Sequence, residues 1–456
     1  MDIQQLVADQ KEFFSSGATL SPEVRIAALK QLKAVILRRE GDILSALRTD
    51  LGKCPAEGYL CEVGMTLSAL NDILRHIPSW ARPHRVPTPL AQFPSRSYTV
   101  HNPYGVALVM SPWNYPFLLT MEPLIGAIAC GNCCVVKPSA DAPATSHVMR
   151  EILAEVFPEN WVAVVTGGRR ENQALLEQHF DTIFFTGGVT VGKEVMRHAA
   201  EHLTPVTLEL GGKSPCIIDA TADLDLAAKR IAFGKLLNCG QTCVAPDYVL
   251  IDKAVEEAFL ERLKFHMEHM YGSHPLENGD YVHMVNRKHY DRVLGLISPE
   301  KVVFGGYGNP DTLRIAPTVL RNVTEDDPIL QEEIFGPVLP VLTFDTVEEA
   351  FRRIAARPHP LACYLFSRDR QVQRRYENQA FFGGGCINDT VIHLATHFMP
   401  FGGVGSSGMG SYHGRSTLET FSHTKSIVKK STQIDLPMRY APYGKLSQKL
   451  IRLFLR

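Results

Sequence analysis

Two segments of the sequence carry residue types that could form and break a covalent bond to a substrate. In Asn238-Cys239-Gly240-Gln241-Thr242-Cys243, a polar, glycine-containing turn could hold the Cys243 thiol at an exposed loop as a nucleophile. In Leu208-Glu209-Leu210, apolar neighbours would raise the pKa of the Glu209 carboxyl and suit it to act as a general base near neutral pH. Spacing alone leaves three alternatives open: Cys239 and Cys243 as packed core thiols, the same two cysteines as a Cys-x3-Cys metal pair, and Glu209 as an edge glutamate that faces solvent.

A third segment has the glycines that a phosphate-binding turn needs. Gly187, Gly188 and Gly192 follow the apolar run 183–186 and precede a helical pattern. Such a turn could place a dinucleotide phosphate at a helix N-terminus, although it is not the G-x-G-x-x-G pattern. This segment is a modest signal by itself.

The cysteines outside this loop favour packing over chemistry. Ten cysteines in 456 residues are too sparse for a disulfide scaffold, so we expect reduced thiols in a reducing compartment. Cys130, Cys133 and Cys134 lie between apolar runs, without a second ligand cluster or a nearby His pair. We therefore expect core packing there and no metal site.

The elements that must position these residues follow from hydrophobic periodicity. Short β-branched runs alternate with helical patterns, which is typical of βαβ units and a parallel sheet. A second α/β stretch begins near residue 210 and extends to about residue 397. The strands expected in the two stretches are 106–110, 134–137, 162–166, 183–186, 206–210, 249–251 and 338–344, and the helices expected there are 144–156, 191–202, 255–270 and 347–356.

Three further segments differ from this alternation. Residues 21–50 have apolar positions at three- and four-residue steps and predict one long amphipathic helix. Residues 80–102 contain four prolines and predict a hairpin that leaves the main sheet. Residues 445–456 alternate leucines with basic residues; they predict a terminal helix docked on this protein or on a partner, with a membrane-surface helix as the alternative.

Charge and hydropathy exclude several classes of protein. The 47 Lys and Arg residues balance 48 Asp and Glu residues, so no global field attracts nucleic acid or anionic lipid. The N-terminal residues lack the basic and apolar regions of a secretory signal, and no apolar run approaches the roughly 18 residues of a membrane span. We expect a cytoplasmic protein without a stable membrane anchor.

Taken together, these segments resemble the aldehyde dehydrogenase superfamily, most closely its class 3 branch, which acts on fatty and aromatic aldehydes. The resemblance extends from about residue 20 to about residue 425, and Ala245-Pro246-Asp247-Tyr248 follows the cysteine as in class 3. The matching strings, in the family's order, are Leu51-Gly52-Lys53 with Glu57, Ser111-Pro112-Trp113-Asn114-Tyr115-Pro116, Gly131-Asn132 with Val135-Val136-Lys137-Pro138-Ser139, Phe184-Phe185-Thr186-Gly187, Leu208-Glu209-Leu210-Gly211-Gly212-Lys213, Gly240-Gln241-Thr242-Cys243, Ala316-Pro317-Thr318, Glu332-Glu333-Ile334-Phe335-Gly336-Pro337, and Pro400-Phe401-Gly402-Gly403 through Gly408.

The resemblance implies a role for each matching residue. Cys243 would be the nucleophile that forms a thiohemiacetal and then a thioester, Asn114 an oxyanion donor, and Glu209 the base that activates water for hydrolysis. The cofactor, NAD or NADP, would bind Lys137 through its ribose hydroxyls. The other residues implied in cofactor binding are Thr186, Gly187, Gly192, Glu333 and Phe335. His413 would border the substrate funnel, where a structural role is the alternative, and Cys386 and Asn388 would support the site from below.

Two positions depart from the family pattern. Ala140 stands where many relatives have a glutamate that accepts a hydrogen bond from the ribose 2′-hydroxyl. Without that carboxylate a 2′-phosphate meets no charge repulsion, so we predict that NADP is tolerated. Gly188 replaces a polar residue and could loosen the turn around the pyrophosphate.

The resemblance also implies an architecture and an assembly. It predicts a Rossmann-like α/β cofactor domain (residues 1–81 and 103–208), an α/β catalytic domain (209–397) and a small oligomerisation element (82–102 and 398–456) in a homodimer. The predicted reaction is NAD(P)-dependent oxidation of a medium- or long-chain aliphatic or aromatic aldehyde to its carboxylate. Three alternatives stay open: a reductive or acyl-transferring relative with another acceptor, a non-enzymatic scaffold, and a thiol esterase.

Overall fold

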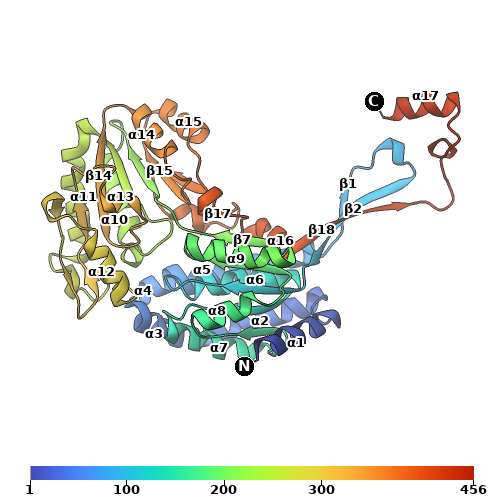
Figure 1. Cartoon of the computed structure of the whole chain (residues 1–456), viewed down its shortest axis with the longest axis horizontal. Coiled ribbons are helices and arrows are strands. Elements are labelled where there is room, and N and C mark those ends of the chain that lie inside the picture. Colours follow the sequence, from blue (N-terminus) through green and yellow to red (C-terminus); the bar gives the residue numbers. More distant parts are fainter. Residues whose placement is uncertain (1, 456) are drawn as a thin grey trace.

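The computed structural model describes residues 2–455, and two largely parallel sheets organise most of them (Figure 1). In the first sheet every neighbouring pair is parallel except β17 and β7. The sheet confirms the five strands expected between residues 106 and 210, within two residues at their ends. In spatial order its strands are β17 (Gly408–Met409), β7 (Val206–Glu209), β6 (Thr182–Thr186), β3 (Val106–Met110), β4 (Cys133–Lys137) and β5 (Val162–Val164).

Helices surround this first sheet and bury its apolar strands. The most apolar of them, α6, has all but one of its residues buried, because it packs between β3 and β4 on one side and α2 and α5 on the other. Cys130, Cys133 and Cys134 are buried at its end and in β4, which confirms core packing. The helices of this part are α1 (Ile3–Ser15), α2 (Pro22–Arg38), α3 (Glu40–Leu51), α4 (Pro55–Gly58), α5 (Gly64–Trp80), α6 (Leu118–Cys130), α7 (Pro143–Val156), α8 (Arg169–Leu176), α9 (Val189–His202) and α16 (Gly414–Phe421).

The single long helix expected over residues 21–50 is wrong: the structure has two helices there. α2 ends at Arg38, and Arg39 leaves the helical region with φ −100° and ψ 17° before α3 begins at Glu40. The Arg39 side chain donates to Asp42 in the new helix and to Glu151 on α7. The apolar pattern continues across the break because both helices bury residues in the same core.

The second sheet has seven strands and is parallel except at its edge pair, β10 and β13. Its strands β9 and β14 and its helices α11 and α14 confirm the patterns expected in the second α/β stretch. In spatial order the strands are β10 (Val302–Phe304), β13 (Thr318–Leu320), β14 (Val338–Phe344), β9 (Tyr248–Asp252), β8 (Pro215–Ile218), β15 (Ala362–Phe366) and β16 (Gly384–Ile387). The accompanying elements are α10 (Leu224–Leu236), α11 (Glu256–Tyr271), α12 (Arg287–Gly295), α13 (Pro328–Gln331), α14 (Val347–Ala355), α15 (Arg370–Gln379) and the hairpin of β11 (Gly308–Asn309) and β12 (Arg314–Ile315).

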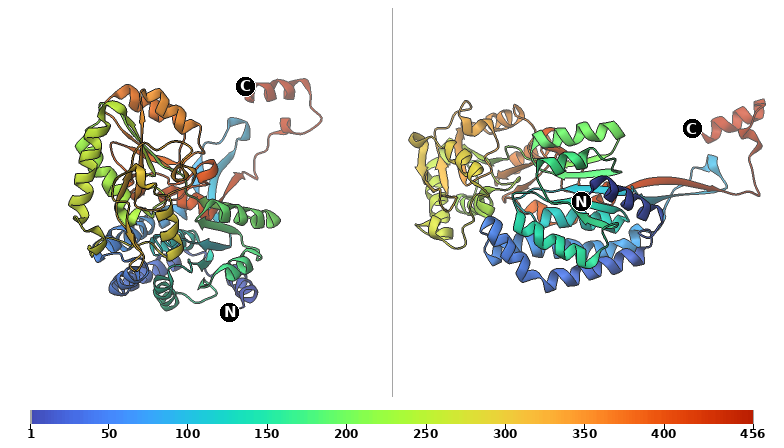
Figure 2. Two further views of the ribbon diagram at one scale, coloured as in Figure 1. Left: turned by 60° about the vertical axis from the view of Figure 1, so that its left-hand side comes forward. Right: turned by 60° about the horizontal axis from the view of Figure 1, so that its bottom comes forward.

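A third, antiparallel sheet extends away from both α/β parts, as Figures 1 and 2 show. It contains β1 (His84–Val86), β2 (Ser95–Pro103) and β18 (Ser422–Lys430), so the proline-rich excursion pairs with a strand from the C-terminal region. Beyond it lies α17 (Lys445–Phe454), none of whose residues is buried. Within residues 2–455, no helix combines the length and apolar character needed to cross a membrane.

The order of the first sheet brings the candidate residues to one edge. The chain passes from β3 to β4 and β5 on one side of β3 and then returns to place β6 and β7 on the other side. Ligands of such sheets bind outside the carboxyl ends of the strands, where the order reverses. Lys137, Thr186 and Glu209 are the last residues of β4, β6 and β7, so all three lie at this edge.

Candidate active site

The segment that carries Cys243 is a strained loop directly after α10. Asn238 and Cys239 both have positive φ angles, 52° and 55°, which side-chain-bearing residues rarely adopt. The Asn238 backbone N–H donates to the buried Glu57 carboxylate at 2.8 Å, and its side chain donates to the Asn114 carbonyl at the same distance. At Gly240 a Cβ would lie 2.3 Å from the Gly336 carbonyl oxygen, so only glycine fits.

The residues on either side of the loop's end fix the position of the thiol. The Gln241 side chain donates to the His283 carbonyl and accepts from the Val285 N–H, each at 3.0 Å. The Tyr115 hydroxyl lies 2.6 Å from the Thr242 hydroxyl. Because such a network holds the backbone at a single geometry, Cys243 is presented in one place.

Cys243 is half-buried, whereas Cys239 is fully buried and lies in the core. Burial, followed by the charges of Glu333 and Glu209, raises the pKa of the Cys243 thiol to about 12. The two carboxyls must therefore lie near the sulfur. The interpretation of both cysteines as packed core thiols holds for Cys239 alone.

Asn114 lies next to this loop and retains a free donor. Its side-chain Nδ2 donates to the Gln241 carbonyl at 3.0 Å, and an amide nitrogen has a second N–H. The Asn114 carbonyl accepts from Lys53 Nζ at 2.9 Å. Lys53 in turn pairs with Glu62 at 2.5 Å, and both side chains are fully buried.

This buried ion pair is a feature that the sequence reasoning missed. Lys53 belongs to a recognised string without a role, and no local signal marks Glu62, which lies in a short π-helical turn, η1 (Tyr59–Val63). The second Glu62 oxygen accepts from the backbone N–H groups of Phe117 and Leu118, at 3.0 and 2.9 Å. Through these hydrogen bonds the Lys53 and Glu62 pair holds both the Asn114 backbone and the start of α6 in place.

Glu209 is buried at the end of β7, so the interpretation as a solvent-facing edge residue is wrong. Neither carboxyl oxygen has a hydrogen-bond partner among the described residues. Desolvation therefore raises the pKa of Glu209 well above its usual value. An unpartnered, uncharged carboxyl near a thiol is free to exchange protons with a reacting group.

The candidate cofactor residues on the first sheet lie along its carboxyl edge. Lys137 is buried, and its Nζ donates to the carbonyls of Pro138 and Gly167, each at 2.8 Å; burial lowers its pKa to about 8. The Thr186 hydroxyl is buried without a partner among the described residues. Gly187 donates its N–H to the Glu209 carbonyl, and Gly192 lies in the first turn of α9. The unpartnered Thr186 hydroxyl lies just before the N-terminus of α9, and the buried Lys137 cation lies at the same edge of the sheet. Together these groups fit a dinucleotide.

Glu333 comes to the same region from the second α/β part. Its Oε1 is buried without a partner among the described residues, and burial raises its pKa to about 8. A Cβ at Gly211 would lie 2.1 Å from Glu333 Oε2, so the glycine allows the carboxyl to approach the segment after Glu209. Phe335 has φ 50° and packs edge-on against Trp113. Both residues are thus placed where a ligand on the first sheet would extend toward Cys243.

Lys213 fixes the segment that carries Glu333, a role that the sequence reasoning did not assign to it. Its Nζ pairs with Asp247 and donates to the carbonyls of Ile329 and Glu332, at 2.9 and 2.8 Å. The other oxygen of Asp247 accepts from the Ile334 N–H. The signal was present, since Lys213 and Asp247 both stand in the recognised strings, but only the fold brings them together.

An apolar cavity of about 230 Å³ opens beside Cys243. At its wall the buried side chains of His413 and Glu122 lie 3.3 Å apart, Nε2 to Oε1. His413 thus combines a structural partner with a place in the funnel. The apolar side chains around the cavity are Leu60, Met65, Leu118, Leu119, Phe233, Leu237, Val391, Ile392, Leu394, Ala395, Phe401 and Tyr412.

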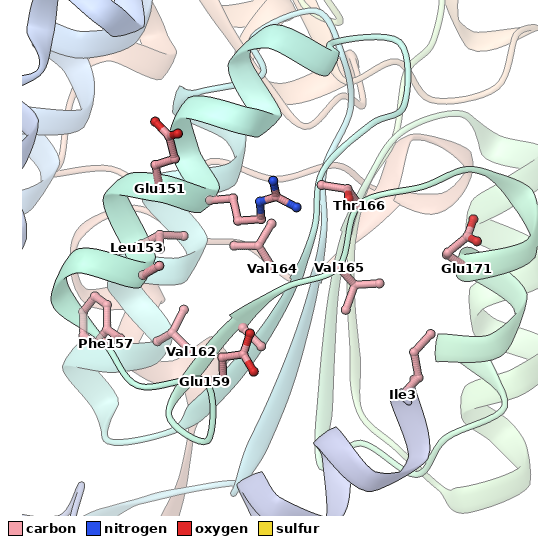
Figure 3. Close-up of a pocket in the computed structure, with 13 residues that line it drawn as sticks. Ile3, Glu151, Leu153, Phe157, Glu159, Val162, Val164, Val165, Thr166 and Glu171 are labelled. Atoms are coloured by element: carbon pink, nitrogen blue, oxygen red, sulfur yellow. The ribbon is translucent and has the colours of Figure 1, made fainter. Parts of the chain in front are cut away.

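A larger cavity, of about 570 Å³, lies beside β5, the outer strand of the first sheet (Figure 3). Glu151, Glu159 and Glu171 surround it, and it contains none of the candidate catalytic or cofactor residues. Within the described residues, no group of three or more His, Cys, Asp and Glu side chains is arranged to hold a metal ion.

Fold and site together define the class of the protein, an α/β oxidoreductase with a thiol beside a dinucleotide-type sheet. The sequence model of the aldehyde dehydrogenase family matches residues 1–427, and the chain belongs to that family. This confirms the family, the α/β fold and the NAD(P) cofactor expected from the sequence.

Individual relatives are similar over almost their whole length. The chain is 45% identical to a 4,4′-diaponeurosporen-aldehyde dehydrogenase of Staphylococcus aureus, covering 100% of this chain and 99% of the relative. It is 41% identical to a dimeric NADP-preferring aldehyde dehydrogenase of Canis lupus familiaris, covering 96% and 98%. The substrate-bound structure of Staphylococcus aureus AldH superposes with a TM-score of 0.98 at 45% identity, covering 100% and 99%.

Proposed function

We propose that this aldehyde dehydrogenase oxidises apolar aldehydes to carboxylates, with Cys243 as nucleophile, Asn114 as oxyanion donor and Glu209 as the base for hydrolysis. The observation that carries the proposal is the placement of the half-buried Cys243 thiol at an apolar cavity, with the unpartnered Glu209 carboxyl close enough to shift its pKa. The family membership supports the reaction class.

In the first step the Cys243 sulfur adds to the aldehyde carbon and forms a thiohemiacetal. The negative charge that develops on the oxygen is met by the free Asn114 side-chain N–H and by the Cys243 backbone N–H. Because Asn114 is held by Gln241 and Lys53, its donor needs no reorientation during the reaction.

When bound, NAD(P) supplies the acceptor for the hydride that leaves the thiohemiacetal. Lys137 is suited to bind ribose hydroxyls, and Thr186, Gly187 and Gly192 line the turn for the pyrophosphate. Glu333 would accept from the ribose next to the nicotinamide, since its buried Oε1 has no partner in the described part of the chain. Phe335 would pack beside it.

Glu209 completes the reaction by removing a proton from the water that hydrolyses the Cys243 thioester. A base for this step must lie near the sulfur without a permanent partner, and both carboxyl oxygens meet this condition. The products are the carboxylate and a free thiol. The presence of this base favours hydrolysis over acyl transfer to another acceptor.

The cavity supports a substrate class. Its wall is mostly apolar, with few polar residues such as Thr242, His413 and Glu122, so it favours medium- or long-chain aliphatic and aromatic aldehydes over small polar ones. The printed name of the Staphylococcus aureus relative, a diaponeurosporen-aldehyde dehydrogenase, is consistent with an apolar substrate.

The assembly and location belong to the proposal as well. We infer a homodimer in which the projecting sheet of β1, β2 and β18 is the oligomerisation element, since β18 offers nine mostly exposed residues at a sheet edge. Residues 405–421 of the expected 398–456 segment instead pack on the first α/β part through β17 and α16. We keep residues 1–81 with 103–208 as the proposed cofactor domain and 209–397 as the proposed catalytic domain; the separation of β3–β7 from β8–β16 into two sheets supports this division, although Glu209 itself ends β7. Ten free cysteines support a cytoplasmic location.

The proposal is tested by the absorbance of reduced nicotinamide, with purified protein, NAD or NADP, and aldehydes of increasing chain length and aromatic character. Turnover that increases with apolar chain length, with the carboxylate as product in the absence of coenzyme A, is the expected result. Cofactor binding without turnover on any aldehyde would refute it.

A further inference from the structure

A second groove, of about 340 Å³, lies at the carboxyl edge of the first sheet, between β4 and the start of α7. Lys137 lies next to the groove, because its Nζ donates hydrogen bonds to the carbonyls of Pro138 and Gly167, which both line it. Arg150 and Thr166 are shared with the neighbouring cavity of Figure 3. The residues around the groove are Pro138, Ser139, Ala140, Pro143, Ser146, His147, Arg150, Thr166 and Gly167.

Arg150 brings an uncompensated positive charge to this groove. It lies one turn after His147 on α7, and its Nη2 is 3.4 Å from His147 Nδ1. Within residues 2–455, no carboxylate oxygen lies within 4 Å of the Arg150 guanidinium nitrogens. Arg38 and Arg39, by contrast, each have such a partner. Ala140, which also lines the groove, contributes no carboxylate.

The carboxylates beside the groove have other partners, and Asp141, which follows Ala140, accepts from the Asn286 side chain at 3.1 Å. Glu151 lies 3.2 Å from His147, but its other oxygen accepts from Arg39 at 2.7 Å. Glu171 accepts from the Gly168 N–H at the start of its own helix. Arg150 is therefore a cation of the groove lining that has no carboxylate partner among the described residues, next to Lys137 at the proposed ribose position.

We propose that Arg150, with His147 beside it, forms the subsite for the 2′-phosphate of NADP, an inference that rests on the proposed function. A 2′-phosphate carries up to two negative charges and accepts paired hydrogen bonds from a guanidinium, while the 2′-hydroxyl of NAD offers no charge. A ribose held at Lys137 would lie beside this groove, where Ala140 contributes only a methyl group. Arg150 thus determines specificity between the two cofactors.

Direct binding of two small probes tests the subsite independently of turnover. The probes are 2′,5′-ADP, which carries the 2′-phosphate, and 5′-AMP, which lacks it, both measured by calorimetry at low ionic strength. The parent protein should bind 2′,5′-ADP about tenfold or more tightly than 5′-AMP, as expected for a charge-assisted contact. Arg150→Ala should remove this preference and leave 5′-AMP binding within about twofold.

Two further variants complete the design. Arg38→Ala removes the same charge from an exposed arginine that pairs with Glu155 outside the groove, and it should keep the parent preference. Ala140→Glu places a carboxylate in the groove lining at an exposed position, and it should weaken 2′,5′-ADP binding about tenfold without weakening 5′-AMP.

The outcomes separate the two levels of the argument. Equal binding of both probes by the parent, or an unchanged preference in Arg150→Ala, overturns the 2′-phosphate subsite while the proposed function stands. Failure of NAD, NADP, 5′-AMP and 2′,5′-ADP all to bind the folded protein overturns the proposed function and the subsite with it.

Discussion

Replacing Glu209 by glutamine separates the proposed hydrolysis step from folding. The parent carboxyl is buried and has no hydrogen-bond partner in the described structure, and desolvation raises its pKa well above the usual value, so burial favours its uncharged form. Glutamine has almost the same shape and no charge. The melting temperature of Glu209→Gln should therefore stay close to that of the parent.

The same substitution should strongly slow turnover. General base catalysis contributes about 10²- to 10⁴-fold, so the steady-state rate of Glu209→Gln should fall by a factor in this range. Formation of the thioester does not use this base in the proposed mechanism. Stopped-flow absorbance should therefore show a rapid burst of about one reduced cofactor per subunit, followed by the slow rate.

The pH dependence of the parent provides a second readout. A base with a raised pKa is ionised only as the pH rises through that pKa, so kcat should increase with pH to higher values than an ordinary glutamate would require, whereas Glu209→Gln should lose this dependence. Glu159→Gln, at an exposed residue beside the cavity of Figure 3, is the matched control and should behave as the parent does. Loss of turnover without a burst, or an unchanged steady-state rate, would refute the assignment.

Further substitutions and modifications test the neighbouring groups. Cys243→Ser should abolish aldehyde oxidation while calorimetry still detects NAD(P) binding, and Cys239→Ser, at the buried neighbour, should keep most of the activity; activity in Cys243→Ser would remove the central assignment. In the unliganded protein, iodoacetamide should modify Cys243 about tenfold faster per pH unit from about pH 7 to about pH 10, because its pKa is about 12; a plateau near pH 8 would contradict this value. Glu62→Gln should lower the free energy of unfolding by about 3–5 kcal/mol in urea titrations, because it leaves Lys53 buried and unpaired. A Lys53→Met, Glu62→Leu double variant should recover most of this loss. An equal loss of stability in the two variants would contradict the role of the pair.

The sequence predicts the parts of the fold that depend on local pattern. The run 106–110 is apolar throughout and becomes β3, buried between neighbouring strands on both sides. The break at Arg39 was missed, because its cause lies in contacts with Asp42 and with Glu151, which is more than a hundred residues away. Periodicity carries no information about such partners.

The candidate site divides in the same way. Cys243, Glu209 and Asn114 stand in recognisable strings, so their identities are visible in the sequence. The Lys53 and Glu62 pair is not, since these residues meet Asn114 only after α5, α6 and the loop at Asn238 have packed together. Likewise, the positive φ of Asn238 and Cys239 has no signal in residue type, because the surrounding contacts impose it.

The pKa shifts explain how one buried site can use a thiolate and a carboxylate in turn. Ionised Glu209 raises the pKa of the Cys243 thiol, so the two negative charges disfavour each other in this desolvated pocket. During attack on the aldehyde the thiol proton leaves to solvent water and the negative charge lies on sulfur, so Glu209 is best left protonated. Once the sulfur is held in a thioester it has no charge, and Glu209 can ionise and accept the proton of water. The absence of a hydrogen-bond partner on Glu209 among the described residues lets the same carboxyl meet both conditions, whereas a fixed ion pair would hold it in one.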